Sequence, residues 1–399
     1  MILLTTLADA KDAFRQRDLR QALYDEGHHL MTGVIVNLHG TAHLDRRRLE
    51  NRLFRRDTFA YYEASVIPAI IAEVLASAID AGRGDLLTLA RRTMMTLSLN
   101  VAGIDRSDDP SEIDRIYELM DRLARASTVG HSTGDKPAIV ADGDAALDEF
   151  DITYVRASLA RRRRLLDDVT AGRLDEADLP RDVLTTLLRN QDRLDLPPAT
   201  VLREVAYFPW VGSHSTSNQF VHAMHHIFTW LQDRPGDTRA DRSRLIADPV
   251  LCQRFVHESL RLHPASPVSL RTAVAEVVLR SGTVVPCDET VTIDLVQANR
   301  DPSVFGPTAD QFDPFRLLPE GVSPWGLTFG HGLHACLGQE LAGGIEPMEN
   351  DLERHLLGSI TVMAGIALAA GATPDPERPA QLDSTTTRHV FGSYPVCFD

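Results

Sequence analysis

The chain has 399 residues, of which 43% are hydrophobic, and this is enough apolar material to bury a large core. Its 41 basic and 56 acidic side chains give a formal charge of −15 at pH 7, so the protein is a poor candidate for wrapping nucleic acid. No apolar run approaches the ~20 residues needed to span a bilayer, and charged residues soon follow residues 1–4, so we expect a cytoplasmic protein without a signal peptide or a membrane anchor.

Apolar residues at helical spacing predict helices over most of the first three quarters of the chain. The predicted helices cover residues 8–24, 41–54, 65–81, 85–101, 111–126, 149–170, 199–231 and 249–262. Between two of them, Gly130, Gly134, Pro137 and Gly143 predict a loop over residues 128–144.

After Pro267 the spacing of apolar residues changes to that of strands. Short strands are predicted at 268–273, 277–279 and 290–294, followed by an irregular packed segment over 299–325, a helix over 338–357, and strands and turns from 360. The chain carries no low-complexity segment, fixed repeat or obvious linker. We therefore expect one domain over residues 1–399, mainly α with a smaller β region.

The most informative string is residues 329–338, Phe-Gly-His-Gly-Leu-His-Ala-Cys-Leu-Gly. Its glycines permit tight turns and the close approach of a flat ligand. The helix predicted directly after Cys336 would point its N-terminal amides at the sulfur and stabilise a thiolate, as a sulfur ligand of iron requires. A buried structural cysteine is one alternative. A zinc site made of His331, His334 and Cys336 is another, although it lacks a fourth ligand and the usual paired cysteines.

The string resembles the haem-binding loop of the cytochromes P450, Phe-Gly-x-Gly-x-His-x-Cys-x-Gly, without a mismatch. The resemblance implies the cytochrome P450 fold, with haem b (iron protoporphyrin IX) between the long central helix and the cysteine loop. It implies that Cys336 ligates the iron and that His334 hydrogen-bonds a haem propionate. The other residues that it assigns to haem binding in this loop are Phe329, Gly330, Gly332 and Gly338.

A Glu-x-x-Arg pair precedes the cysteine at the distance expected in the family. Glu258 and Arg261 share one helix face, and taken alone such a pair is more simply a solvated surface bridge. The resemblance instead implies that the pair joins Arg316, in the segment Asp-Pro-Phe-Arg, to form a buried bidentate network that fixes the cysteine loop.

Three further side chains resemble the family's propionate ligands. Arg271 follows Pro267 in a predicted strand, and His43 and Arg47 lie one turn apart on a helix. A surface arginine and a solvated helix face are the alternatives. The arginines around that pair form either a solvated face or a docking surface for an acidic iron–sulfur donor: Arg46, Arg48, Arg52, Arg55 and Arg56.

Residues 211–218, Val-Gly-Ser-His-Ser-Thr-Ser-Asn, resemble the family's Ala-Gly-x-Asp/Glu-Thr segment, in which an acid and a threonine relay protons during dioxygen activation. After Gly212, His214 replaces the acid and Ser215 replaces the threonine, although a shift of one residue would make Thr216 the working hydroxyl. Histidine can pass protons near neutral pH. The alternatives are an outward-pointing histidine and hydroxyls that bond to the preceding turn. Three more histidines on this helix have metal-like spacing, and we expect them on a solvated face: His222, His225 and His226.

The resemblance implies a monooxygenase that hydroxylates or otherwise oxidises a small, largely apolar secondary metabolite, with electrons from a ferredoxin and its reductase. Because the acid–threonine pair is replaced, peroxide-driven oxidation, coupling or rearrangement is the alternative, and a non-catalytic haem ligand carrier or sensor is a third hypothesis. The family usually has further elements before the segment resembled by residues 8–24, so the chain is expected to be short at its N-terminus. No nucleic-acid or membrane partner is expected.

Overall fold

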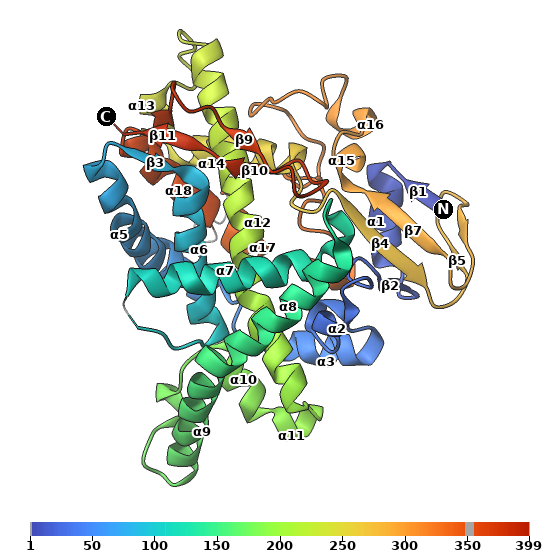
Figure 1. The fold of residues 1–399 in the computed structure, drawn as a ribbon. Helices are drawn as coiled ribbons and strands as arrows, with labels where there is room; N and C mark the ends of the chain where they lie inside the picture. The colour runs from blue at the N-terminus through green and yellow to red at the C-terminus, as the bar shows by residue number, and fades with distance from the viewer. Residues whose placement is uncertain (1, 108, 348–354, 399) are drawn as a thin grey trace. The chain divides into compact units, whose positions relative to one another are not determined.

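The computed structural model describes residues 2–107, 109–347 and 355–398. These residues form a mainly helical fold with small sheets, which confirms the predicted class (Figure 1). The chain divides into two compact units, and each is assembled from separate segments. Unit 1 comprises Met1–Ala22, Arg56–Ala90 and Ser215–Asp399, and unit 2 comprises Leu23–Arg55 and Arg91–His214. The prediction of a single domain remains a prediction.

Unit 2 is helical. It contains α2 (His28–Met31), α3 (Gly40–Glu50), α7 (Pro110–Ser127), α8 (Lys136–Phe150), α9 (Arg156–Thr170), α10 (Val183–Arg189) and α11 (Gln191–Leu194), with turns η1 (Ile35–Asn37), η3 (Val129–His131), η4 (Asp151–Val155) and η5 (Glu176–Asp178). It also takes the second part of α6 (Leu86–Ala102) and the first part of α12 (Pro198–Asp233). Its apolar core includes the fully buried Met95, Leu99, Ile116, Met120 and Phe150.

Unit 1 holds the sheets. The largest has the strand order β1-β7-β4-β2, from β1 (Ile2–Leu4), β7 (Thr290–Asp294), β4 (Val268–Ala273) and β2 (Leu19–Gln21), with β1 parallel to β7 and the other pairs antiparallel. The smaller sheets pair β3 (Arg83–Asp85) and β8 (Thr373–Pro374) with β11 (Pro395–Cys397), β5 (Val277–Val278) with β6 (Val284–Val285), and β9 (Gln381–Leu382) with β10 (Phe391–Ser393).

The helices of unit 1 precede, separate and follow these strands along the chain. They are α1 (Leu7–Arg15), α4 (Arg56–Tyr61), the π-turn η2 (Tyr62–Val66), α5 (Ile67–Asp80), α13 (Arg242–Ala247), α14 (Pro249–Leu262), α15 (Leu295–Ala298), α16 (Pro302–Phe305), the 3-10 turn η6 (Gly332–His334), α17 (Gln339–Gly343) and α18 (Ser359–Ala369). Their cluster of buried apolar side chains joins α1 to the sheet, with Ala10, Val291 and Ile293 fully buried.

Two predicted elements near the N-terminal half are wrong. The helix predicted over 8–24 ends at Arg15, because residues 19–21 pair as β2 with β4 instead. The loop predicted over 128–144 becomes helix from Lys136, since the Asp135 side chain caps the backbone N–H of Ala138 and Pro137 suits a first turn. Gly143 then lies on α8, where an added Cβ would collide with Ala126 on α7, so this glycine serves close helix packing.

The prediction that no apolar run approaches the length of a membrane span also needs correction. The helix over Arg56–Asp80 has 25 residues and a mean hydropathy of 1.5 in its most apolar window, so by length and composition alone it is long enough to cross a membrane. Within it, Ile67, Ile71, Leu75 and Ala78 are buried at helical spacing, and α5 packs on α18. Such a stripe is typical of a helix that covers a protein core.

Candidate active site: the Cys336 loop

The loop before Cys336 is closed by its own backbone. The Cys336 N–H donates to the carbonyl O of Phe329 at 2.9 Å, and η6 lies between them. Gly330 and Gly332 have φ of 68° and 69°, which a residue with a Cβ rarely adopts. A Cβ on Gly332 would lie 2.5 Å from the carbonyl O of Phe14 on α1. The glycines therefore allow the loop to turn tightly against α1 and leave Cys336 exposed at its end.

The helix after the cysteine is much shorter than predicted. α17 covers only Gln339–Gly343, because the next residue, Gly344, has φ of 77° and ends the helix. The later part of the predicted helix is replaced by an isolated bridge between Ile345 and Leu356, and part of it lies outside the described residues. The tail from 360, predicted as strands and turns, begins with α18 instead. A long helix dipole at the sulfur is thus not available.

Glu258, Arg261 and Arg316 come together in a buried network. Arg261 Nε and Nη2 donate to the two carboxylate oxygens of Glu258, each at 2.7 Å, and Arg316 Nε and Nη2 lie 3.3 Å from Glu258 Oε1. The side chains of the three residues are between 0% and 7% exposed, so the solvated surface bridge is excluded. The remaining guanidinium donors bind backbone carbonyls of the 299–311 segment, among them Asn299 O and Ala309 O at 2.6 Å.

Sequence reasoning missed Asn299 and Thr328, which join α14 to the chain leading into the cysteine loop. Asn299 Nδ2 donates to Arg261 O at 3.0 Å, and its Oδ1 accepts from Leu327 N at 2.7 Å. Thr328 Oγ1 donates to Leu260 O at 2.6 Å. Asn299 is fully buried, and a polar residue directly after the apolar turn of α15 was the available signal.

Arg271 is buried in β4, at 3% exposure, so it is not a surface strand arginine. Its Nη1 donates to the Gln21 side chain of the neighbouring strand and to Ser269 Oγ at 2.8 Å, and its guanidinium lies 5.1 Å from the centre of the Phe14 ring. Phe14 is the residue whose carbonyl contacts Gly332. Arg271 and the cysteine loop, which includes the half-buried His334, thus pack on the same helix, α1.

In unit 2, the structure separates the arginines that were predicted as one surface. His43 and Arg46 on α3 are buried, and Arg46 forms an ion pair with Glu204 of α12. Arg46 therefore does not belong to an exposed docking surface, which corrects the prediction. Burial, with Arg47 and His39 nearby, lowers the pKa of His43 to about 4, so its ring is neutral at pH 7. Arg48, Arg52 and Arg55 are exposed, and Arg56 is half-buried in unit 1.

The 211–218 segment lies inside the continuous helix α12. An added Cβ on Gly212 would lie 2.7 Å from Ser98 Oγ, so this glycine allows α6 to approach α12 within unit 2. His214 Nδ1 lies 3.0 Å from Trp210 O, and its Nε2 lies 3.4 Å from Asp121 Oδ1 of α7. The Tyr117 ring stacks on the His214 ring at 5.2 Å between centres. His214 thus contacts α7, while Ser215 is half-buried and Thr216 is buried at 7% exposure.

Two further predictions concern the histidines of α12 beyond residue 218 and those of the cysteine loop. The expected solvated face of α12 is wrong, because His222 is 2% exposed and His225 and His226 are half-buried among aromatic rings. At the cysteine loop, His331 Nε2 accepts from Arg15 Nε at 3.0 Å. Over the described residues, His331, His334 and Cys336 do not form a group that could hold a metal ion together, which argues against the zinc alternative.

A family model described as Cytochrome P450 matches residues 229–343, which include the Glu258 network and the cysteine loop. "Probable cytochrome P450 313a1" from Drosophila melanogaster is 34% identical over 94 residues, which is 23% of this chain and 19% of that protein. In the first curated relatives the match spans between 17% and 36% of their length.

Solved structures match the whole chain. The crystal structure of CalO2 has a TM-score of 0.75 at 19% identity and covers 100% of this chain and 90% of that one. HmtN, described as a post-tailoring hydroxylase involved in himastatin biosynthesis, has a TM-score of 0.71 at 18% identity, with coverage of 100% and 90%. At these identities the likeness shows the fold, which is the mainly helical fold with small sheets expected above.

Proposed function

Since this chain belongs to the cytochrome P450 family, we propose that it is a haem-thiolate monooxygenase that hydroxylates or otherwise oxidises a small, largely apolar molecule. The observation that carries the proposal is an exposed cysteine, Cys336, on a glycine loop that a buried Glu–Arg–Arg network and Asn299 attach to α14. HmtN, with the same fold, is described as a post-tailoring hydroxylase involved in himastatin biosynthesis, and this supports a secondary metabolite as the substrate.

The residues present fit a haem. Cys336 offers a sulfur at the exposed end of a loop whose left-handed glycines leave little bulk around it. Bound to that sulfur, the haem would supply an iron that activates dioxygen, with electron donation from the thiolate. We propose that Arg271 and His334, both in unit 1, hold a propionate. That His43 and Arg47 also hold a propionate stays a prediction from the sequence. The loop residues Phe329, Gly330, Gly332 and Gly338 would form the surface under the ring.

Proton handling falls to hydroxyls on α12 in this proposal. Ser215 Oγ and Thr216 Oγ1 can each donate one proton and accept another. In this proposal His214 exchanges a proton at Nε2, which lies 3.4 Å from the Asp121 carboxylate. Asp121 then acts as a positioning residue that supplies the carboxylate which the 211–218 segment lacks. Electrons would come from a ferredoxin and its reductase, and a cytoplasmic location is part of the proposal.

The second candidate is a peroxide-driven oxidation, coupling or rearrangement catalyst. It is favoured by the position of His214, whose Nδ1 lies near Trp210 O and Ser213 Oγ and whose Nε2 lies near Asp121. A proton relay then depends on Ser215 or Thr216 alone. The third candidate, a ligand carrier or sensor, requires that no product forms with any oxidant.

The central test is haem binding. The purified protein should take up one haem, and its reduced carbon monoxide adduct should show the strongly red-shifted Soret band of a thiolate complex. Cys336→Ser should abolish that band, whereas Cys287→Ser, which also changes an exposed cysteine, should retain it. A red-shifted band that survives Cys336→Ser would overturn the proposal. Turnover of metabolites that shift the ferric spectrum, assayed with dioxygen plus ferredoxin and separately with peroxide, then separates the three candidates.

A further inference from the structure

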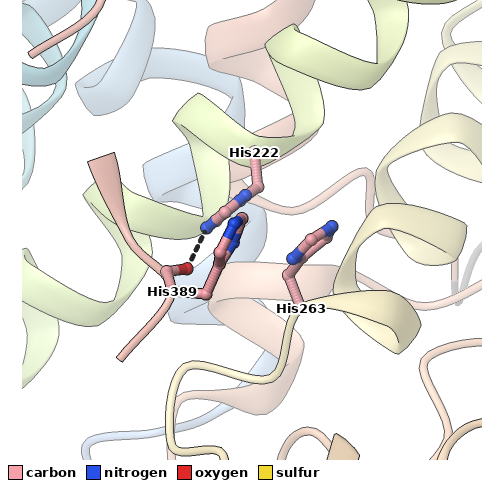
Figure 2. A group of neighbouring side chains, drawn as sticks. All are labelled: His222, His263 and His389. Carbon is pink, nitrogen blue, oxygen red and sulfur yellow. Dashed lines mark hydrogen bonds between the residues drawn. The ribbon is translucent and has the colours of Figure 1, made fainter. Parts of the chain in front are cut away.

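A second cluster of side chains in unit 1 has no part in the chemistry proposed above. His222 of α12, His263 at the C-terminal end of α14 and His389 before β10 each offer a ring nitrogen, and these atoms lie within 4.8 Å of one another. Figure 2 shows the three rings gathered from three separate segments. His222 is buried, His263 is half-buried and His389 is exposed, so the cluster is enclosed on one side and accessible on the other.

We propose that His222, His263 and His389 form a binding site for a borderline divalent transition cation, with Zn²⁺ as the best match. Zinc is commonly held by three imidazole nitrogens with a water in a fourth, open position. The exposure of His389 provides that open side. Calcium and magnesium prefer oxygen ligands, and in the described residues this group contains none, so those ions are disfavoured.

The hydrogen bonds around the cluster orient its ring nitrogens. His222 Nε2 donates to the carbonyl O of His389 at 2.9 Å, so the lone pair of the neutral ring is on Nδ1. His263 Nε2 lies 3.0 Å from His226 Nε2, and with His263 as the donor its lone pair is likewise on Nδ1. Metal-binding histidines commonly donate their second N–H in this way, which fixes the tautomer. His226 in turn stacks on Phe312 at 4.3 Å between ring centres.

The surroundings keep the rings neutral. Burial lowers the pKa of His222 to about 4 and that of His226 to about 3, and it lowers the pKa of His263 as well. Neighbouring imidazoles and Arg300 act in the same direction on His226 and His263. Neutral imidazoles are the form that binds metal. The positive charge of Arg300 opposes the binding of a cation. We therefore expect a dissociation constant on the order of 10 µM, which is weaker binding than at structural zinc sites.

The rings must close slightly around an ion. Zinc–nitrogen bonds of about 2.0–2.1 Å in a tetrahedral site place ligand nitrogens about 3.4 Å apart. The His222 and His263 rings are stacked, with centres 4.2 Å apart and planes 8° apart, so coordination would tilt one ring against the other. His389 can rotate at small cost because it is exposed. Bound zinc would then connect α12, the end of α14 and the segment before β10.

The experiment is calorimetric titration of the tag-free, haem-loaded protein with ZnCl₂. We expect one zinc per chain, a thermal midpoint that rises with zinc concentration, and a zinc absorption-edge spectrum with three nitrogen ligands at about 2.0–2.1 Å. His389→Ala should weaken binding at least tenfold, and because His389 is exposed this variant should fold. His263→Asn provides a second, independent ligand variant.

Two control variants keep the triad intact. His225→Ala removes a neighbour whose Nδ1 bonds to the Tyr394 hydroxyl, and His29→Ala removes a half-buried histidine paired with Asp144 in unit 2, so both variants should bind zinc as the parent does. The absence of saturable binding below 1 mM, unchanged affinity in both ligand variants, or a sulfur ligand in the edge spectrum would each overturn the proposal. These readouts do not depend on turnover, and the carbon monoxide spectrum of the same sample reports separately on the Cys336 site.

Discussion

At the scale of single residues, backbone conformation determines where the cysteine can lie. Gly332 combines a positive φ with a contact to the Phe14 carbonyl that leaves no room for a Cβ. Gly338, two residues after Cys336, has φ of −90° and no atom within 4 Å of an added Cβ. Packing therefore requires a glycine at position 332, whereas it leaves room for a larger side chain at position 338.

Gly332→Ala should displace the loop from α1. The left-handed backbone costs a residue with a Cβ about 1–2 kcal/mol, and the contact with Phe14 adds to this. We expect a lower free energy of unfolding in urea and a lower haem content after purification. Gly338→Ala is the matched control and should change stability by less than about 1 kcal/mol. If Gly338→Ala lowered the free energy of unfolding as much as Gly332→Ala, this account of Gly332 would be wrong.

A buried arginine and an exposed one should respond very differently to the same substitution. Arg261→Lys keeps the charge but loses the bidentate contact with Glu258 and bonds to backbone carbonyls, so we expect a loss of about 3–5 kcal/mol. Arg280→Lys, at a side chain 82% exposed, should cost between about 0 and 1 kcal/mol. Urea unfolding of the two variants measures both losses of stability. Similar losses would show that the buried contacts of Arg261 do not contribute more than those of an exposed arginine.

At the scale of elements, two helices of unit 2 share a buried cluster of charged groups. Glu204 of α12 accepts from Ile35 N at 3.0 Å and pairs with Arg46 of α3. Glu50 of α3 lies 3.9 Å from the same guanidinium, and within the described structure its carboxylate oxygens have no hydrogen-bond partner. Burial raises the pKa of Glu50 well above its usual range, with the Glu204 charge as the next cause. Burial also raises the pKa of Glu204 to about 7, and Arg46 and the Ile35 N–H oppose that rise. We infer that at pH 8 Glu204 is the ionised partner and Glu50 the protonated one.

This cluster predicts a pH-dependent stability. With a raised pKa in the folded state, Glu50 binds a proton more tightly there than in the unfolded chain, so its contribution is fully present below the unfolded pKa and is lost as pH rises towards the folded one. Glu50→Gln should therefore raise the free energy of unfolding at pH 8 by about 1–3 kcal/mol, with a smaller gain at pH 5. Denaturation at the two pH values measures the difference.

Glu204→Gln is the contrasting variant. It leaves Arg46 without its closest carboxylate and should destabilise the protein by about 3–5 kcal/mol at pH 8. If Glu50→Gln were instead less stable than the parent at both pH values, the assignment of the proton to Glu50 would be wrong.

At the scale of the whole molecule, charge is unevenly spread. The protein carries a net charge of −15, yet Arg48, Arg52 and Arg55 are exposed close together in sequence. Such a basic region on an acidic protein would steer an acidic electron donor, and its effect should fall as salt screens it. Arg46 is buried beside Glu204 and cannot contribute to this steering, so it would depend on the exposed arginines alone.

The double variant Arg48→Glu and Arg52→Glu should slow association with an acidic ferredoxin about tenfold at low ionic strength, with a smaller change at 0.5 M salt. A control with the same change of net charge reverses Arg280 and Arg254, which lie in unit 1. Stopped-flow reduction of the haem-loaded protein measures both rates. Equal slowing by the two double variants would assign the effect to net charge and not to this surface.

The sequence by itself determined the cysteine loop, most helices, the strands β4 and β7, and the pairing of Glu258 with Arg261. These features depend on local spacing and on a short string, which are visible without contacts. Only the tertiary structure decided that Arg46 is buried, that α17 is short, that Gly212 and Gly143 serve helix packing, and that His222, His263 and His389 meet. α17 ends at Gly344, which has a positive φ and no room for a Cβ beside Leu356 O. The others depend on the burial of one segment against residues distant in the chain, and burial of that kind leaves no periodic pattern in the sequence.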